Sequence, residues 1–184
     1  DFDKLIAMNF CQQNKIDYES LLRGERESLI LAAERAKIEL QNNEESELNI
    51  SIRGNSYKYK ISNDVLEKIS RPIFDAIKDV IKKAVKDSGF TADEIDKMIM
   101  VGGSSYMPIV IEYLKNLLKI PVILADDLDC MVAKGLGKYL GIKQRMLEVR
   151  DIVVTDICPF SLSTSTVNKS DRSKPLSKVI IPKN

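Results

Sequence analysis

Apolar residues recur at helical spacing through the first ninety residues of this chain. The pattern predicts a short helix over residues 4–11 and a long helix over about 25–41. A third helical pattern runs from about 64 to 88. Pro72 kinks or divides it, because proline removes a backbone donor, and Gly89 suits the position after its end.

Two segments between these helices alternate apolar and polar residues instead. Leucine and isoleucine alternate with polar residues over 48–52, and tyrosine and isoleucine do so over 57–61, with Gly54-Asn55 between the two segments. This alternation around a turn sequence predicts a β-hairpin.

A strand, loop and helix pattern follows in the second half of the chain. Four apolar residues at 98–101 predict a buried strand, then come two glycines and two serines, and an amphipathic run over 109–118 predicts a helix. A serine can cap this helix, and Pro108 suits its first turn. Glycines let a ligand approach the backbone closely, and the helix N-terminus offers N–H groups to an anion or a nucleotide.

This glycine loop matches neither of two common phosphate-binding motifs. No Gly-Lys-Ser/Thr sequence follows it, so it is not a P-loop, and it lacks the third glycine of the dinucleotide fingerprint. Taken alone, it is equally well explained as an ordinary connection between a strand and a helix.

A second strand and helix continue the pattern. Residues 121–124 predict a strand, an aspartate-rich loop follows at 126–129, and a helix begins near Asp129. This order implies two parallel strands joined by a right-handed crossover. Such sheets bind ligands at the carboxyl ends of their strands, where both the glycine loop and the aspartate loop lie.

The flanking segments are shorter and more polar. Residues 91–94 have the form of a capping box for a short helix. Beyond residue 151 we expect an apolar linker to 156, a strand-like segment over 157–162, a polar loop over 163–173 and one more strand over 176–181.

The composition excludes several classes of function. With 28 basic and 27 acidic residues the charge is balanced, so neither nucleic acid nor a membrane is an expected partner. No apolar run approaches the length of a membrane span. Three scattered cysteines indicate a reducing, cytoplasmic setting. The chain has no histidine, which excludes histidine-based catalysis and metal binding within it.

Four motifs in order along the chain resemble the seventy-kilodalton heat-shock (DnaK-type) chaperone family. They are Glu34–Lys37, Val101–Ser104 with Pro108 beyond it, Asp129–Gly135 and Asp156–Leu162. The last motif is similar to a divergent branch of the family. The similarity covers essentially the whole chain.

The resemblance implies an α/β fold with an α+β upper subdomain. The chain would be the second lobe of an actin-like ATPase fold, truncated at its N-terminal strands. Residues 1–13 and 91–148 would form the lower α/β subdomain, and 14–90 the upper helical subdomain with the hairpin. Residues 149–156 would be the interdomain linker, and 157–184 would begin a β-rich peptide-binding domain.

The resemblance also implies positions that contact a nucleotide. Glu34 and Lys37 match contacts to the sugar, and Asp129 matches the aspartate beside the glycine loop. In this chain, the family's loop on the adenosine side is matched by Gly102, Gly103 and Ser104. The alternative for Glu34 and Lys37 is an ion pair on a solvated helix face.

Three positions depart from the family pattern around the base. The family has two basic side chains that sandwich the adenine, and here the matching positions are Ile38 and Tyr106. Tyrosine can still stack on adenine, whereas isoleucine covers the other face without cation–π attraction. Gln41 stands where the family has a small hydroxyl residue.

We therefore interpret the chain as the nucleotide-binding lobe of an ATP-dependent chaperone that binds unfolded polypeptides. ATP or ADP would be the cofactor, with Mg²⁺ held mainly by a first lobe outside this chain. This chain would contain no catalytic and no metal-binding residue, and alone it would hydrolyse no ATP. A J-domain co-chaperone and a nucleotide-exchange factor on the upper subdomain are the expected partners.

Two alternatives stay open at this point. One is another actin-like ATPase or a sugar kinase, and the other is a non-enzymatic actin-like filament protein. A separate expectation concerns the strands near 98–101 and 122–124. If they lack neighbours, the segment 152–162 adds to their edge within one chain or in a dimer.

Overall fold

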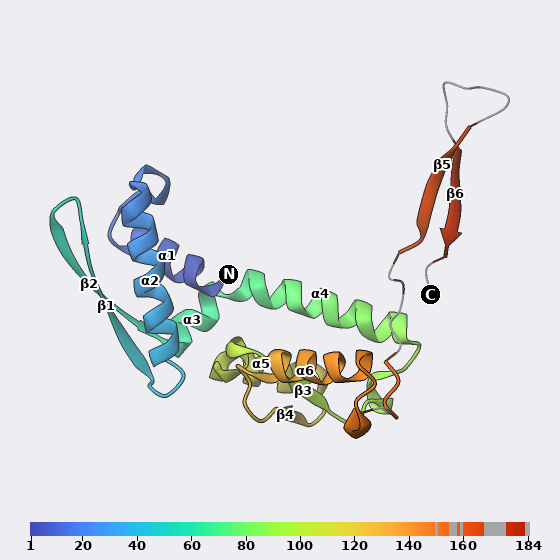
Figure 1. Cartoon of the computed structure of the whole chain (residues 1–184). Helices are drawn as coiled ribbons and strands as arrows, with labels where there is room; N and C mark the ends of the chain where they lie inside the picture. Colours follow the sequence, from blue (N-terminus) through green and yellow to red (C-terminus); the bar gives the residue numbers. More distant parts are fainter. Residues whose placement is uncertain (150, 155–157, 159, 168–175, 183–184) are drawn as a thin grey trace. The chain divides into compact units, whose positions relative to one another are not determined.

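The computed structural model of the chain describes residues 1–149, 151–154, 158, 160–167 and 176–182 (Figure 1). The chain divides into two compact units, Asp1–Lys134 and Gly135–Asn184. None of the helices in the described ranges is both long and apolar enough to cross a membrane.

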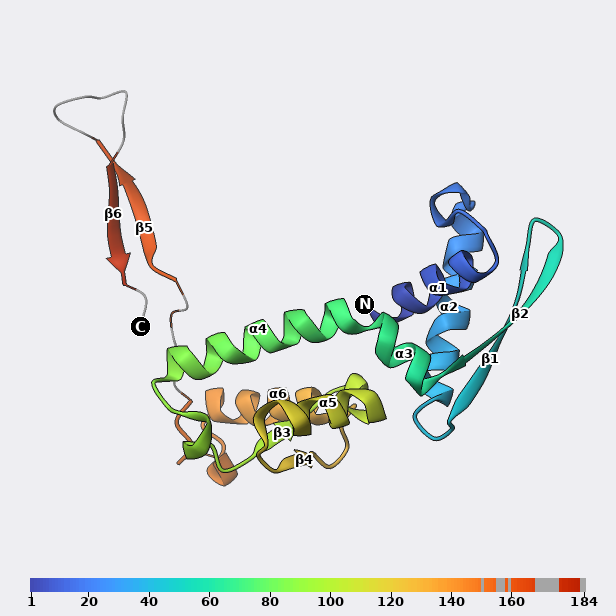
Figure 2. The ribbon, with the colours of Figure 1, turned by 180° about the vertical axis from the view of Figure 1, so that it is seen from behind.

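The first unit begins with two helices packed against a hairpin. The helices are α1 (Phe2–Gln13) and α2 (Arg23–Glu39), and a single 3-10 turn, η1 (Tyr18–Ser20), lies between them. Both predicted helices are confirmed, although α2 ends two residues before Gln41. Figures 1 and 2 show α1 and α2 next to each other on one side of the hairpin, and the Phe10 ring of α1 packs edge-on against Tyr57 and Tyr59 of the hairpin.

The predicted hairpin is also confirmed. Strands β1 (Glu45–Ile52) and β2 (Asn55–Ser62) pair antiparallel. The turn is Arg53-Gly54 rather than the predicted Gly54-Asn55, because Asn55 already pairs with Ile52, and both turn residues have positive φ angles, 51° and 77°. Two residues with positive φ match the right-handed twist of the flanking strands, which is why a glycine is needed here.

Two further helices follow directly on the hairpin. They are α3 (Asn63–Ile69), whose Val65 N–H donates to the Ser62 hydroxyl, and α4 (Arg71–Ser88). Pro72 lies in the first turn of α4, so it divides the long helical pattern as predicted. Gly89 ends α4 with a φ of 76°, and the short helix expected after it is a single 3-10 turn, η2 (Ala92–Glu94).

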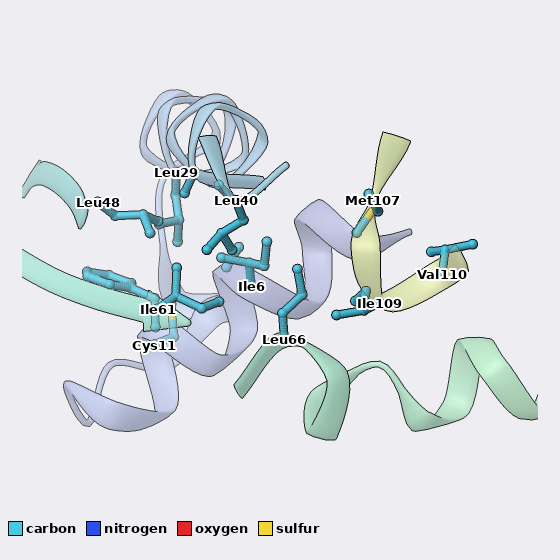
Figure 3. Close-up of a cluster of buried hydrophobic side chains, with 14 of the residues drawn as sticks. Ile6, Cys11, Leu29, Leu40, Leu48, Ile61, Leu66, Met107, Ile109 and Val110 are labelled. Carbon is cyan, nitrogen blue, oxygen red and sulfur yellow. The ribbon is translucent and has the colours of Figure 1, made fainter. Parts of the chain in front are cut away.

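The core of this unit is formed by side chains from all of these elements. Figure 3 shows Ile6 of α1, Leu40 beyond α2, Ile61 of β2 and Leu66 of α3 pointing toward one another. All four are at most 1% exposed. Burying each such side chain contributes about 1.5–3 kcal/mol, so this cluster fixes how α1, α2 and the hairpin lie.

The rest of the first unit carries the predicted parallel pair, but the prediction of a buried strand over 98–101 is wrong, because only Met100 is buried and Ile99 and Val101 are exposed. Strands β3 (Met98–Met100) and β4 (Val122–Leu124) pair in parallel, with Met98 opposite Val122 and Met100 opposite Leu124. The 3-10 turn η3 (Gly103–Tyr106) and helix α5 (Pro108–Leu118) connect them. Helix α6 (Met131–Lys143) begins two residues later than expected.

The serine caps expected before the helix over 109–118 are wrong. Both serines lie in η3, and the residue before α5 is Met107, which makes no side-chain cap. The Ser105 hydroxyl is buried and donates to the Val101 carbonyl instead, at 2.9 Å. The glycines are therefore separated from the N-terminus of α5 by a 3-10 turn.

The second unit contains the remainder of α6, a 3-10 turn η4 (Leu147–Val149) and a second hairpin. Strands β5 (Leu162–Thr166) and β6 (Leu176–Ile181) pair antiparallel. The strand predicted over 176–181 is confirmed.

Two predictions for this unit need correction. The polar loop predicted over 163–173 is wrong for residues 163–166, which form a strand. Thr164 and Thr166, both β-branched, pair with residues of β6. Of the strand-like segment over 157–162, only Leu162 is in a strand among the described residues. Residues 155–157, 159 and 168–173 lie outside the described residues.

Glu25 joins the start of α2 to the turn of the first hairpin. Its carboxylate accepts hydrogen bonds from the Leu22 N–H at 3.0 Å and from the Arg53 N–H at 2.9 Å. These two backbone donors lower the pKa of Glu25 below its ordinary value of 4.5. The ionised carboxylate therefore stabilises the folded chain.

We predict that Glu25→Ala lowers the melting temperature at neutral pH. Because the pKa is lowered by folding, this stabilisation is fully present above pH 4.5 and is lost as the pH falls through the lower folded-state pKa. Thermal unfolding followed by circular dichroism across this range should show that the difference in melting temperature between Glu25→Ala and wild type decreases as the pH falls.

Glu27→Ala is the matched control, since Glu27 is exposed and its ion pair is with Arg23, one turn earlier on the same helix. It should melt close to wild type at every pH. Equal melting temperatures for Glu25→Ala and Glu27→Ala would contradict the role of Glu25.

Candidate functional site

One pocket of the first unit gathers residues from two distant stretches of the sequence. It has a volume of about 400 Å³. The lining residues are Glu34, Lys37, Ile38 and Gln41 on one side, and Gly103, Ser104, Tyr106 and Asp129 on the other. Eight of the nine residues predicted from the sequence therefore line the same pocket.

The first wall is the outward face of α2. Leu29, Ala33 and Ala36 are buried, so the residues between them at helical spacing face away from the core. Ile38 is 50% exposed there. The helix ends at Glu39, and a hydrogen bond of 3.1 Å from the Gln41 N–H to the Ile38 carbonyl keeps Gln41 one turn beyond Ile38.

The second wall is the glycine loop together with the aspartate loop. Gly102 does not line the pocket, but it sets the path of the loop. Its φ of 91° is a backbone conformation that residues with a side chain rarely adopt. Its N–H donates to the Leu128 carbonyl at 3.2 Å, and the Ala125 N–H donates to the Met100 carbonyl at 3.1 Å. These bonds hold the two loops beside each other.

Gly103 brings the backbone close to Asp129. A Cβ atom at Gly103 would lie 3.4 Å from the Asp129 Oδ1, so the carboxylate lies directly against this residue. A glycine thus lets the carboxylate and the loop share one side of the pocket.

Asp127 and Lys134 fix the aspartate loop where it enters α6. They form an ion pair, which lowers the pKa of Asp127 and raises that of Lys134. Asp127 has a positive φ of 52°, and its carbonyl accepts from the Cys130 N–H at 2.9 Å. The turn between Asp127 and Cys130 determines where Asp129 lies.

Lys37 is held by a partner that the sequence analysis missed. Its Nζ lies 2.8 Å from the Asp3 Oδ1, and the two side chains are only 17% and 14% exposed. The alternative of an ion pair between Glu34 and Lys37 is therefore wrong. No sequence pattern pairs Asp3 with Lys37, because their contact depends on how α1 packs against α2.

The polar side chains that remain are free to bind a ligand. Those of Glu34, Gln41, Ser104, Tyr106 and Asp129 make no hydrogen bond or ion pair to any residue in the described part of the chain. Two carboxylates, an amide and two hydroxyls thus surround a space that Ile38 and Tyr106 border with apolar and aromatic surface. The described residues include no cluster of three or more metal-ligand side chains.

This arrangement suits a small, flat, polar molecule. Carboxylates accept hydrogen bonds from vicinal hydroxyls, and an aromatic and an aliphatic side chain can enclose a planar ring. With Lys37 already neutralised by Asp3, the pocket has an excess of negative charge from Glu34 and Asp129. A fold with a parallel strand pair and such a pocket at its carboxyl edge is typical of nucleotide-binding α/β proteins.

The chain belongs to the Hsp70 family. The family model described as Hsp70 protein matches residues 1–184. The fold is accordingly the actin-like ATPase fold of this family, as the motifs predicted. The match also decides against a sugar kinase and an actin-like filament protein.

Individual relatives agree with the family match. The chain is 29% identical over 188 residues to chaperone protein dnaK1 of Prochlorococcus marinus subsp. pastoris, covering 97% of this chain and 26% of the relative. It is 29% identical over 177 residues to chaperone protein DnaK of Thermus thermophilus, covering 90% of this chain and 28% of the relative. The chain thus spans about a quarter of the length of these relatives.

We predict that the ion pair between Asp3 and Lys37 is a stabilising contact between α1 and α2. Asp3→Asn leaves the Lys37 ammonium largely buried without its partner, which should cost roughly 3 kcal/mol of unfolding free energy. Urea unfolding of Asp3→Asn, Lys37→Met and the double variant measures the coupling between the two side chains.

The double variant should be more stable than the sum of the two single changes predicts. Additive effects would show that the two side chains do not interact. Glu27→Gln, at an exposed position of α2, serves as the control for a charge change alone.

Proposed function

We propose that this chain is the nucleotide-binding lobe of an ATP-dependent molecular chaperone and that its pocket holds the nucleoside of ATP or ADP. The observation that carries this proposal is the gathering, around a space bordered by Ile38 and Tyr106, of five polar side chains that have no partner among the described residues. Its volume of about 400 Å³ is within the range of pockets for small molecules. The residues present therefore fit a nucleoside.

Each side chain has a role in this proposal. Glu34 and Asp129 accept hydrogen bonds from the ribose hydroxyls, and Lys37 stays beside Glu34, held by Asp3. Tyr106 stacks on one face of the adenine, and Ile38 covers the other. Gly103 lets the backbone approach the ligand, and Gly102 fixes the path of the loop.

The phosphates and the metal ion are assigned to residues outside this pocket. By the family resemblance, a first lobe holds the phosphates together with Mg²⁺, which supplies the charge stabilisation for phosphoryl transfer. The residues of this chain bind and orient the nucleoside. We therefore assign no catalytic residue within residues 1–184.

The remaining parts of the chain have proposed roles that follow from the family. Residues 1–13 and 91–148 form the lower subdomain, 14–90 the upper subdomain that a nucleotide-exchange factor contacts, and 149–156 the linker. The β-rich domain that begins at residue 157 binds unfolded polypeptides, and a J-domain co-chaperone takes part in their delivery. The chaperone names of the relatives support this assignment, and three free cysteines favour a reducing cytoplasm.

We predict that the chain binds adenosine weakly, with a dissociation constant on the order of millimolar. ATP should bind about as well as adenosine, because Lys37, the cation among the lining side chains in the described part of the chain, is paired with Asp3. Tyr106→Ala should weaken adenosine binding by about fivefold, through the loss of roughly 1 kcal/mol of stacking. Titration of the ¹⁵N-labelled chain, followed by NMR, measures all three quantities.

Tyr139→Ala is the matched control, because Tyr139 is an exposed tyrosine of α6 that does not line the pocket. It should leave adenosine binding unchanged. If Tyr106→Ala binds adenosine as tightly as wild type, the stacking role is wrong. If saturating adenosine moves no resonance near Gly103 or Glu34, the pocket is not a nucleoside site.

A further inference from the structure

We propose that Asp3 of α1 is a positioning residue for the pocket: by holding the Lys37 ammonium, it keeps the Glu34 carboxylate free to accept a hydrogen bond from a ligand. Asp3 does not itself line the pocket. The inference rests on the proposed nucleoside site and adds a residue of another helix that controls it. Its basis is a competition between two carboxylates for one ammonium group.

Lys37 has two carboxylates within its reach. Across to α1, its Nζ lies 2.8 Å from the Asp3 Oδ1. Along α2, Glu34 lies three residues earlier, a spacing at which a carboxylate and an ammonium of one helix can pair. The structure contains the first pair, and the Glu34 side chain makes no ion pair with any residue in the described part of the chain.

Helix α2 gives these two side chains no other partner at pairing distance. Among the residues three and four positions from Lys37, Glu34 is the single carboxylate; the others are Ala33, Leu40 and Gln41. Among the residues at the same spacing from Glu34, Lys37 is the single cation; the others are Ile30, Leu31 and Ile38. Without Asp3, the ammonium would therefore turn to Glu34.

Burial makes the pair with Asp3 the preferred one. The Lys37 and Asp3 side chains are only 17% and 14% exposed, whereas Glu34 is exposed. An ion pair gains more where water screens it less, so Lys37 stays with Asp3. The Asp3 Oδ1 atom is buried, and among the described residues no hydrogen-bond donor other than the Lys37 ammonium lies against it. Separating the pair would leave a buried carboxylate oxygen without a partner.

The partner of Lys37 determines what the pocket offers a ligand. Lys37 and Glu34 both line the pocket, and Glu34 and Asp129 are the carboxylates assigned to the ribose. If Glu34 accepts from Lys37 instead, a ligand hydroxyl must first displace the ammonium. The apparent affinity then falls in proportion to the fraction of chains in which Glu34 is free.

The test measures adenosine binding by NMR titration of the full ¹⁵N-labelled chain in a double-mutant cycle. Asp3→Asn should weaken adenosine binding by about threefold, because the exposed pair between Lys37 and Glu34 then forms in roughly two thirds of the chains. In the Lys37→Met background the same change should alter the affinity by less than about 1.5-fold, since no ammonium remains to occupy Glu34.

Salt separates this competition from a general loss of structure. At about 1 M NaCl the Debye length is about 3 Å, which weakens an exposed ion pair. Asp3→Asn should then recover adenosine binding, while wild type changes little because adenosine is uncharged. Glu19→Gln is the matched control, since it removes the carboxylate of another ion pair of α2, with Arg26, and does not line the pocket. It should bind adenosine like wild type at low and at high salt.

A further measurement uses the wild-type chain, so it does not depend on how the variants fold. The Lys37 Hε protons should show nuclear Overhauser effects to the Asp3 Hβ protons both without ligand and with saturating adenosine. Loss of these contacts on binding would show that Lys37 turns to the ligand, and would overturn the role of Asp3.

The outcomes separate this inference from the proposed function. If wild type binds no adenosine, the proposed nucleoside site is wrong and the inference fails with it. If wild type binds adenosine and Asp3→Asn binds it equally well, the inference alone is wrong. The same holds if Asp3→Asn weakens binding equally in the Lys37→Met background, because the loss would then come from the packing of α1 rather than from the ammonium.

Discussion

The burial of one face of α2 is the constraint on which the pocket depends. Leu29, Ala33 and Ala36 are at most 2% exposed, and the packing of α1 against α2 brings Asp3 within reach of Lys37. Once this face is buried, helical geometry leaves Glu34 and Ile38 facing outward. The chemistry of the first wall is thus determined by a packing contact on the opposite side of the helix.

The second wall depends on backbone hydrogen bonds between loops. The parallel pairing of β3 with β4 places the glycine loop and the aspartate loop at one edge, and the Gly102 N–H joins them through the Leu128 carbonyl. Leu128 is itself 2% exposed, so this junction is anchored in the interior. The proposed nucleoside site then depends on the five polar side chains that have no partner among the residues described.

Periodicity predicted most of the elements because local sequence determines them. The turn at Gly54, although predicted one residue later than it occurs, the division at Pro72 and the end of α4 at Gly89 each follow from the backbone preference of a single residue. The prediction missed the strand at Ser163–Thr166, whose polar sequence resembles a loop until β6 pairs with it. It also missed the Asp3–Lys37 pair and the 3-10 turn before α5, because both depend on tertiary contacts. Eight pocket residues were predicted because they match positions of the family pattern. Composition and spacing alone explained the glycine loop equally well as an ordinary turn.

In the proposed complex, α2 and the glycine loop enclose one nucleoside. Intermolecular nuclear Overhauser effects between adenosine and the labelled full chain test it most directly. We expect contacts from the purine H2 or H8 proton to the methyl groups of Ile38 and to the ring of Tyr106 in the same complex, with ribose protons near Lys37. Contacts to only one wall, or to residues outside the pocket, would contradict it.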